Sequence, residues 1–122
     1  MTLVANYILT SNTGQLSSGG QTEAAFHFGS LPDNALGNDS LLGFMVVAGP
    51  SPDLRVEAIL NDGPVIWGFN NLAANTTTQF FAQIGFNGLK SGPTDNKITF
   101  KIVAGTGNFI VNNCVIWYHQ NI

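Results

Sequence analysis

The sequence predicts an all-β fold, an antiparallel two-sheet sandwich of about eight strands with a jelly-roll arrangement. Apolar residues recur with period two or in short blocks, and clusters of Gly, Pro, Asn and Asp separate the blocks. No segment shows the apolar stripe of an amphipathic helix. The chain has 122 residues without an internal repeat or a linker-like stretch, so residues 1–122 are predicted to form one domain.

The alternation is clearest in "NKITFKIVAG", residues 96–105. One face of this strand is expected in the core and the other in water, because successive side chains of a strand point to opposite faces. The residues expected in the core are Ile98, Phe100, Ile102 and Ala104, and those expected in water include Lys97 and Lys101.

A hairpin is predicted where "DLRVEAIL" and "PVIWGF" flank Asn61-Asp62-Gly63. Asp-Gly is a favoured positive-φ pair for a tight turn. Pro64 indicates that the second arm is an edge strand or begins there, since proline cannot donate to a ladder. On this arm we expect Val65, Trp67 and Phe69 to share one face.

The remaining strands and their connections follow from the same pattern of apolar blocks and turn residues. Strands are predicted at residues 3–10, 22–29, 41–48, 77–86 and 108–119. Long polar connections are predicted at 11–21, 30–40 and 87–96, with at most one short helical turn, at 31–39.

Charged residues make up only 9% of the chain, against about 25% in an ordinary domain. Asn, Gln, Ser, Thr and Gly supply the polar surface instead, as in "SNTGQLSSGGQT". With four Lys and Arg residues and a net charge of −3, the chain lacks the basic footprint that nucleic acid or an anionic membrane requires. "MTLVANYILTSN" does not read as a signal peptide, and no apolar run would span a membrane. This composition is compatible with an extracellular or particle-surface role.

Few residues could carry catalysis. His27 and His119 each lie inside a predicted strand, where a structural role is the commoner one. The carboxylates are scattered among separate segments, and no nucleophile or metal-binding motif is present. Cys114 is the only cysteine and lies in an apolar run, so we expect a buried thiol. The sequence therefore predicts no enzyme and requires no cofactor.

A calcium site is the one metal site that the sequence suggests. Asp33, Asn38 and Asp39 fall in one short segment, and calcium binds carboxylate, amide and backbone oxygens. The spacing does not match the helix-loop-helix calcium motif. Asn and Asp also form ordinary turns, so turn formation stays open as the alternative.

The aromatic residues suggest a ligand site. Trp67 is followed by Asn70 and Asn71, which pairs a ring with amide groups. Trp117 and Tyr118 are adjacent on a strand, so their side chains point to opposite faces and at least one is expected outside the core. We predict that Trp67 or Tyr118 stacks on a sugar while the two asparagines bind its hydroxyls. The alternative is that both tryptophans fill the core.

The stretch "GLKSGPTDNKITFKIVAGTGNFIVNNCVIWYH" resembles the closing strands of jelly-roll carbohydrate-binding modules and lectins. An alternating strand, a turn that contains Gly and a final strand carry this resemblance, which covers the last third of the chain. It concerns the architecture and includes no family-specific binding residue. It implies a jelly-roll fold.

Two functional hypotheses follow. The first is a non-catalytic, lectin-like module that recognises a neutral glycan. The alternative is a structural oligomeric subunit of the coat, capsid or fibre-tip type, because 44% hydrophobic residues combine with little charge, as at subunit interfaces. We expect a homo-oligomer, since few charges guard the sheet edges.

Overall fold

The computed structural model describes residues 3–10, 13–32, 34–50, 53–70, 72–84, 89 and 95–121. Within these ranges the chain forms nine strands and no helix. The strands are β1 (Leu3–Leu9), β2 (Gly14–Ser17), β3 (Glu23–Gly29), β4 (Ala35–Ala48), β5 (Asp53–Leu60), β6 (Val65–Asn70), β7 (Thr77–Ile84), β8 (Asn96–Thr106) and β9 (Asn108–Asn121). A search of the described residues for a helix long and apolar enough to cross a membrane found none.

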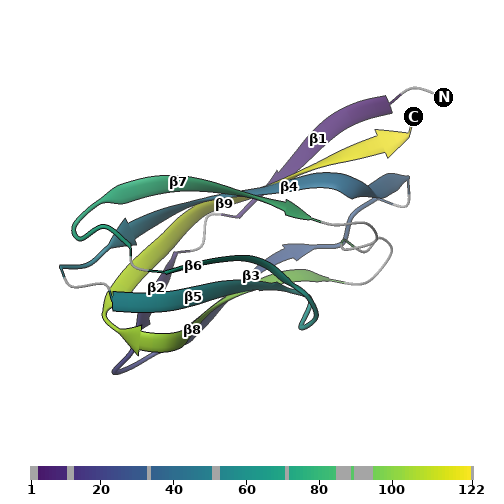
Figure 1. Ribbon diagram of the computed structural model, residues 1–122. Coiled ribbons are helices and arrows are strands. Elements are labelled where there is room, and N and C mark those ends of the chain that lie inside the picture. Colours follow the sequence, from purple (N-terminus) through teal and green to yellow (C-terminus); the bar gives the residue numbers. More distant parts are fainter. Residues whose placement is uncertain are drawn as a thin grey trace.

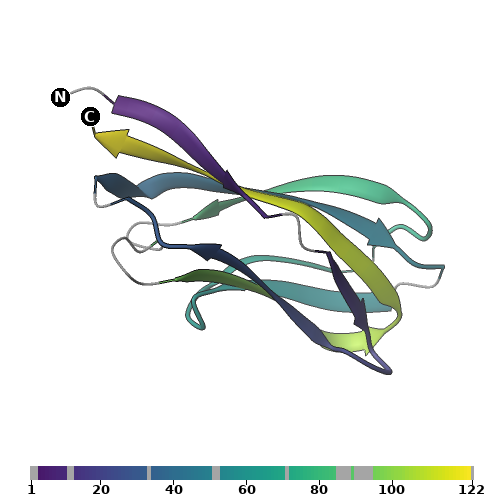
Figure 2. The same cartoon turned by 180° about the vertical axis from the view of Figure 1, so that it is seen from behind.

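The strands form two antiparallel sheets that pack face to face, as Figures 1 and 2 show. The larger sheet has the order β1-β9-β4-β7, with β2 also paired to β9, and the smaller sheet has the order β3-β8-β5-β6. Because β1 and β2 pair with consecutive stretches of β9, they act as one interrupted strand. Counted this way, the sandwich has the eight strands of a jelly roll, as predicted.

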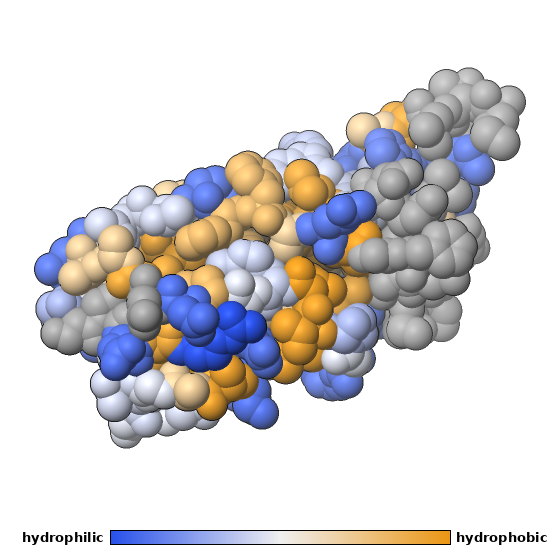
Figure 3. All heavy atoms as spheres, in the orientation of Figure 1, coloured by the Kyte–Doolittle hydropathy of each residue, from blue (hydrophilic) through white to orange (hydrophobic). Residues whose placement is uncertain are grey.

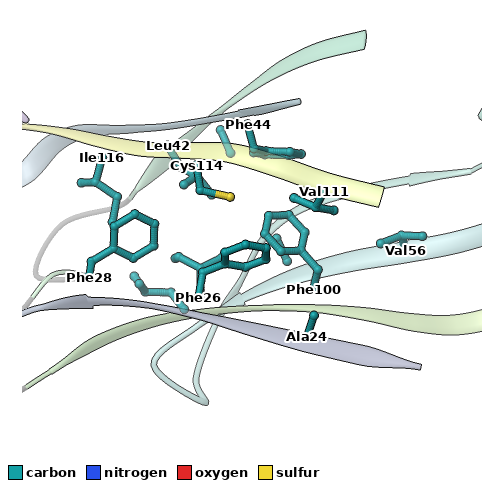
Figure 4. Close-up of a cluster of buried hydrophobic side chains, with 14 of the residues drawn as sticks. Ala24, Phe26, Phe28, Leu42, Phe44, Val56, Phe100, Val111, Cys114 and Ile116 are labelled. Carbon is teal, nitrogen blue, oxygen red and sulfur yellow. The ribbon is translucent and has the colours of Figure 1, made fainter. Parts of the chain in front are cut away.

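The core fills the space between the sheets with side chains from alternate positions of each strand (Figure 4). Phe26 of β3 and Phe100 of β8 meet edge to face, with ring centroids 5.5 Å apart. Cys114 lies among these apolar side chains and is fully buried, which confirms that prediction. Burial raises the pKa of its thiol to about 12, so the thiol stays protonated near neutral pH.

The predicted faces of β8 are confirmed at Ile98, Phe100 and Ile102, which are all buried. The prediction for Ala104 is wrong, because its side chain is exposed. The register between β5 and β8 shifts after Val56 pairs with Ile102, so that Arg55 pairs with Ala104. One extra residue on β8 at this point exchanges the two faces.

The turn between β5 and β6 has its positive φ angles at Asn61 (50°) and Asp62 (57°), one residue earlier than the predicted Asp-Gly pair. The edge position indicated by Pro64 is confirmed, because β6 ends the smaller sheet. Val65 does not share the inner face with Trp67 and is 51% exposed. A register shift between Ala58 and Ile59 separates the two faces, as at a bulge.

Two predicted connections contain strands. The segment 11–21 includes β2, whose Leu16 is buried in the core. The segment 30–40 includes the start of β4, so the suggested helical turn at 31–39 is wrong for residues 35–39. There the backbone of β4 pairs with the end of β9, with Ala35 opposite Gln120. This long-range pairing overrides the local turn preference of the segment.

Candidate functional site

The two sheets differ in charge. Among the side chains that the structure describes, every Asp, Glu, Lys and Arg belongs to the smaller sheet or to a turn or segment beside it: Glu23, Asp53, Arg55, Glu57, Asp62, Asp95, Lys97 and Lys101. Asp39 lies on β4 of the larger sheet and is described only by its backbone. The described side chains of the larger sheet include none of these residue types. The described side chains therefore give the sandwich one charged outer face and one neutral outer face.

Large hydrophobic side chains are exposed on the neutral face. Five of them define a surface that we call the aromatic strip: Tyr7 (61% exposed), Leu9 (62%), Leu41 (37%), Phe81 (57%) and Trp117 (37%). The strand register brings them together. Tyr7 pairs with Trp117, which pairs with Leu41 on its other side. The strip thus crosses the sheet from β1 through β9 and β4 to β7.

Gly43 shapes the centre of the strip. It lies on β4, between Val115 of β9 and Phe81 of β7. A Cβ atom at this position would lie 2.7 Å from Cζ3 of Trp117 and 3.3 Å from Cε1 of Phe81. Both rings therefore lie over the backbone at Gly43, with their centroids 6.1 Å apart. The missing side chain lets the two rings approach each other across an intervening strand.

Amide side chains accompany the strip. Gln83 of β7 is exposed and pairs with Leu41, and Gln79 of the same strand pairs with Met45. Asn113 of β9 is exposed and donates from Nδ2 to the sulfur of Met45 at 3.1 Å. Each amide offers both donors and an acceptor. The outer face of the larger sheet therefore combines aromatic rings with neutral hydrogen-bonding groups.

The structure does not bring the predicted ligand residues together. The ring of Trp67 packs inward against Phe44, with centroids 4.8 Å apart, and also against Phe69 and Phe80. Tyr118 is only 5% exposed, so its ring is not offered to a ligand. The side chains of Trp117 and Tyr118 do point to opposite faces of the sheet, as predicted, but Trp117 is the exposed one.

Asn70 lies at the end of β6, on the face of the smaller sheet that points away from Trp67. It is exposed and borders a shallow hollow of about 260 Å³ together with Asp53 and Arg55. Asn71 lies outside the described residues. Figure 3 looks onto the side of the sandwich where β6 and β7 form the two sheet edges. Hydrophobic residues reach the surface there between the two layers, beside strongly hydrophilic ones.

The calcium prediction stays a prediction. Asp33 lies outside the described residues, and Asn38 and Asp39 are described only by their backbone in β4. A search of the described part of the chain found no group of three or more His, Cys, Asp or Glu side chains that could hold a metal ion.

His27 has an ion-pair partner that the sequence did not reveal. Its Nδ1 lies 2.5 Å from Oδ2 of Asp95, and the other oxygen of this carboxylate accepts the backbone N–H of Gly29 at 2.8 Å. The hydrogen bond from His27 is the largest cause that holds the pKa of Asp95 below its usual value. The imidazole and the carboxylate are 59% and 47% exposed, so the pair lies at the surface beside the end of β3, where an ion pair contributes little to stability.

A larger hollow, of about 500 Å³, lies beside β2 and is bordered by Gln15, Gln21 and Asn108. It differs from the aromatic strip in what it offers a ligand. Phe109 is its aromatic neighbour and is only 2% exposed, so no ring face is available. The amide of Gln21 already donates to the carbonyl of Glu23 at 2.9 Å. The aromatic strip is therefore the stronger candidate for a site that binds by stacking.

No protein-family model matches the sequence, and no curated protein sequence matches it. Solved structures do share the fold. The xylan-binding module CBM15 has a TM-score of 0.57 at 12% identity, over 96% of this chain and 97% of the module. VP2 from the subviral particle of infectious bursal disease virus has a TM-score of 0.56 at 14% identity, over 95% of this chain and 32% of VP2.

Dimeric latent PorU from Porphyromonas gingivalis has a TM-score of 0.58 at 10% identity, over 98% of this chain. This chain spans only 13% of the length of PorU. At such low identities the likeness concerns the fold alone. It confirms the predicted architectural resemblance to jelly-roll carbohydrate-binding modules.

Proposed function

We propose that this chain is a non-catalytic module that binds a neutral glycan on the aromatic strip of its larger sheet. The observation that carries the proposal is the exposure of Tyr7, Phe81 and Trp117 on a face whose described side chains carry no Asp, Glu, Lys or Arg. A sugar ring presents an apolar face that stacks on aromatic rings and a rim of hydroxyls that pair with amides.

The fold comparison supports the proposal. The xylan-binding module CBM15 matches this chain over nearly the full length of both proteins. The match shows that a domain of this size and fold can present a polysaccharide site. The position of the site in this chain is inferred from its own side chains.

The shape of the strip suggests the class of glycan. Tyr7 and Phe81 lie on strands separated by two others, β9 and β4, and neighbouring strands are about 4.8 Å apart. The strip therefore spans about 14 Å across the sheet. A linear oligosaccharide that runs across the strands fits this length better than a single sugar does.

Substitution of Trp117 tests the proposal. We expect Trp117→Ala to weaken binding of soluble xylan or another neutral polysaccharide about fivefold or more, because each lost stacking contact is worth about 1 kcal/mol or more. Phe81→Ala should weaken it similarly. Affinity electrophoresis against a panel of neutral polysaccharides measures binding, and circular dichroism checks that each variant keeps its fold.

Two control variants make the test specific to the strip. Val103→Ala removes an exposed apolar side chain from β8 of the smaller sheet and should leave binding unchanged. Asn70→Ala tests the position that the sequence favoured. Loss of binding in Asn70→Ala together with normal binding in Trp117→Ala would move the site to the end of β6. A parent protein that binds no polysaccharide of the panel would overturn the proposal.

A structural subunit of an assembly is the second candidate function. The strip includes Leu9 and Leu41, which are aliphatic, uncharged and exposed, and such a surface also suits a subunit interface. The similar fold of VP2 from a viral particle is consistent with this role. We propose on this basis that the chain forms a homo-oligomer, which sedimentation velocity measures directly. A monomer without glycan affinity would exclude both candidate functions.

We keep the calcium site as a proposal with its own test. If Asp33, Asn38 and Asp39 hold Ca²⁺, a chelator should lower the melting temperature, because an ion that binds the native state stabilises it. Asp39→Asn should remove the effect of the chelator. An unchanged melting temperature in excess EGTA would exclude a tightly bound calcium ion.

A further inference from the structure

We propose that β1 is a homodimerisation edge, where it pairs in antiparallel fashion with β1 of a second copy about a twofold axis at Asn6. The inference rests on the proposed homo-oligomer and specifies its interface and register. In Figures 1 and 2, β1 and the end of β9 project together beyond the body of the sandwich. This projection leaves the outer edge of β1 accessible to a partner.

The edge of β1 lacks the usual protection. Its sequence, LVANYIL, contains neither a charged residue nor a proline over seven residues. Sheet edges are normally guarded by charge, proline, bulges or shortness. The two edge strands of the smaller sheet are guarded, since Pro64 precedes β6 and β3 carries Glu23 and a bulge before Gly29. The seven residues of β1 have neither the charge nor the proline that would discourage pairing with another strand.

The backbone of β1 has donors that point away from β9. Thr10 donates its N–H to the carbonyl of Cys114 on β9 at 3.0 Å. Because N–H groups alternate sides along a strand, those of Ala5, Tyr7 and Leu9 face the free edge. The N–H of Tyr7 is consistent with this, because it donates to Oδ1 of the neighbouring Asn6 at 2.8 Å. A second strand could take over these outward groups.

The sequence of β1 is nearly symmetric about Asn6. In an antiparallel pair centred there, Leu3 would lie opposite Leu9, Val4 opposite Ile8, Ala5 opposite Tyr7, and Asn6 opposite its own counterpart. Each pair joins residues of similar polarity, as an isologous interface requires. This register also places the outward-facing backbone groups of Ala5 opposite those of Tyr7, which is the pairing that an antiparallel ladder needs.

A second uncharged edge lacks this symmetry. The edge strand β7 reads TTQFFAQI, and its symmetric arrangement would place Phe80 opposite Phe81. Such a register joins an inward-facing position to an outward-facing one and cannot form a regular ladder. Among the described strands of the larger sheet, β1 therefore fits a second copy of itself better than β7 does.

The dimer would extend the neutral face. A twofold axis perpendicular to the sheet keeps the outer faces of both copies on the same side, so the aromatic strips of the two copies would meet along β1. The pairing covers one strand edge and would fall below about 1,200 Å², the size class of weak interfaces. We therefore expect a monomer–dimer equilibrium at high micromolar concentration.

A disulfide across the axis tests the register. In this pairing the two copies of residue 6 are a directly opposed, non-hydrogen-bonded pair, whose Cα atoms lie about 4.5 Å apart. Asn6→Cys should therefore form a covalent dimer under mild oxidation at least about tenfold faster than Ala5→Cys, whose two copies would be offset along the strands. The native Cys114 is buried and will not interfere.

Charge substitution supplies the second measurement. Asn6→Lys would place like charges opposite each other and should weaken dimerisation of the non-oxidised protein by about two- to fivefold, as measured by sedimentation equilibrium. Thr78→Lys adds the same charge on β7 and should leave the equilibrium unchanged. If Asn6→Lys self-associates as the parent does, another surface forms the oligomer and the β1 inference alone fails. A parent that stays monomeric at about 1 mM would overturn both the inference and the proposed homo-oligomer.

Discussion

The backbone at Asn113 determines which aromatic side chain of β9 meets water. Its φ angle is 53°, a left-handed conformation that asparagine tolerates better than most residues. Val111 and Cys114 are both buried although three positions separate them, instead of the two of a regular strand. This bulge exchanges the faces of β9. Beyond it, Trp117 points outward and Tyr118 points into the core.

The opposite faces of β8 predict a large difference between two neighbouring substitutions. Phe100 is fully buried and contacts the rings of Phe26 and Phe44, whereas Lys101 is exposed. Phe100→Ala should lower the free energy of unfolding by about 3–5 kcal/mol through lost burial and a residual cavity. Lys101→Ala should change it by less than about 0.5 kcal/mol. Urea denaturation measures both, and equal effects would contradict the register described for β8.

The pair formed by His27 and Asp95 predicts an acid-sensitive contribution to stability. The folded state holds the pKa of Asp95 below its ordinary value of 3.8, chiefly through the hydrogen bond to His27. A lowered carboxylate pKa stabilises the fold above the unfolded pKa, and this contribution disappears as the pH falls through the folded pKa. Asp95→Asn should therefore lower the melting temperature above about pH 5, and its effect should shrink progressively as the pH falls below the ordinary pKa of 3.8. A difference that persists unchanged in acid would contradict this origin.

At the scale of the strand, Gly105 lets β8 pass close to β5. Its φ angle is +88°, and a Cβ atom there would lie 2.0 Å from the carbonyl oxygen of Asp53. Gly105→Ala should lower the free energy of unfolding by more than about 2 kcal/mol, because it combines backbone strain with a clash against backbone. Gly19 is the matched control, since nothing lies within 4 Å of its Cβ position. A thermal melt in which the two alanine variants behave alike would refute this role of Gly105.

The positions of most strands could be predicted from the alternation of apolar residues, because burial of one face imposes a period of two. Bulges could not be predicted, because two residues of one strand then oppose a single residue of its partner, and the sequence of the bulged strand gives little indication of where this happens. This explains the wrong faces at Val65 and Ala104. The short strand β2 was missed for a related reason, since its four residues are held by pairing with β9 rather than by their own pattern.

The sequence indicated which kinds of side chain form the candidate site, but not where in the fold they meet. Sparse charge and abundant amides indicated a neutral ligand, and the adjacent Trp117 and Tyr118 indicated one exposed ring. The aromatic strip itself joins residues from β1, β4, β7 and β9, which are up to 110 positions apart in the chain between Tyr7 and Trp117. Only the sheet order brings these strands side by side. The sequence favoured Trp67 as a stacking residue, but its ring packs against Phe44 inside the sandwich.

At the scale of the whole molecule, the two outer faces of the sandwich differ in the side chains that they expose. Among the side chains that the structure describes, every Asp, Glu, Lys and Arg belongs to the smaller sheet or to a segment beside it, and these residues include the ion pair between Lys97 and Asp62 at 2.9 Å. The larger sheet offers rings and amides on its outer face. Charge on one face favours solubility and discourages stacking there, while the neutral face keeps its rings available to a ligand or a partner.

This separation predicts how salt affects glycan binding. Coulombic attraction to a charged ligand is screened strongly as salt rises, and binding of a polyanion weakens by orders of magnitude when counterions are released. A neutral glycan on the aromatic strip has neither contribution, since stacking and amide hydrogen bonds depend little on ionic strength. We expect the dissociation constant for a neutral polysaccharide to change less than about twofold between 50 and 500 mM NaCl. Isothermal titration calorimetry measures it, with heparin as the polyanionic comparison. A steep loss of affinity with salt would place the ligand on the charged face of the smaller sheet and would contradict a site on the strip.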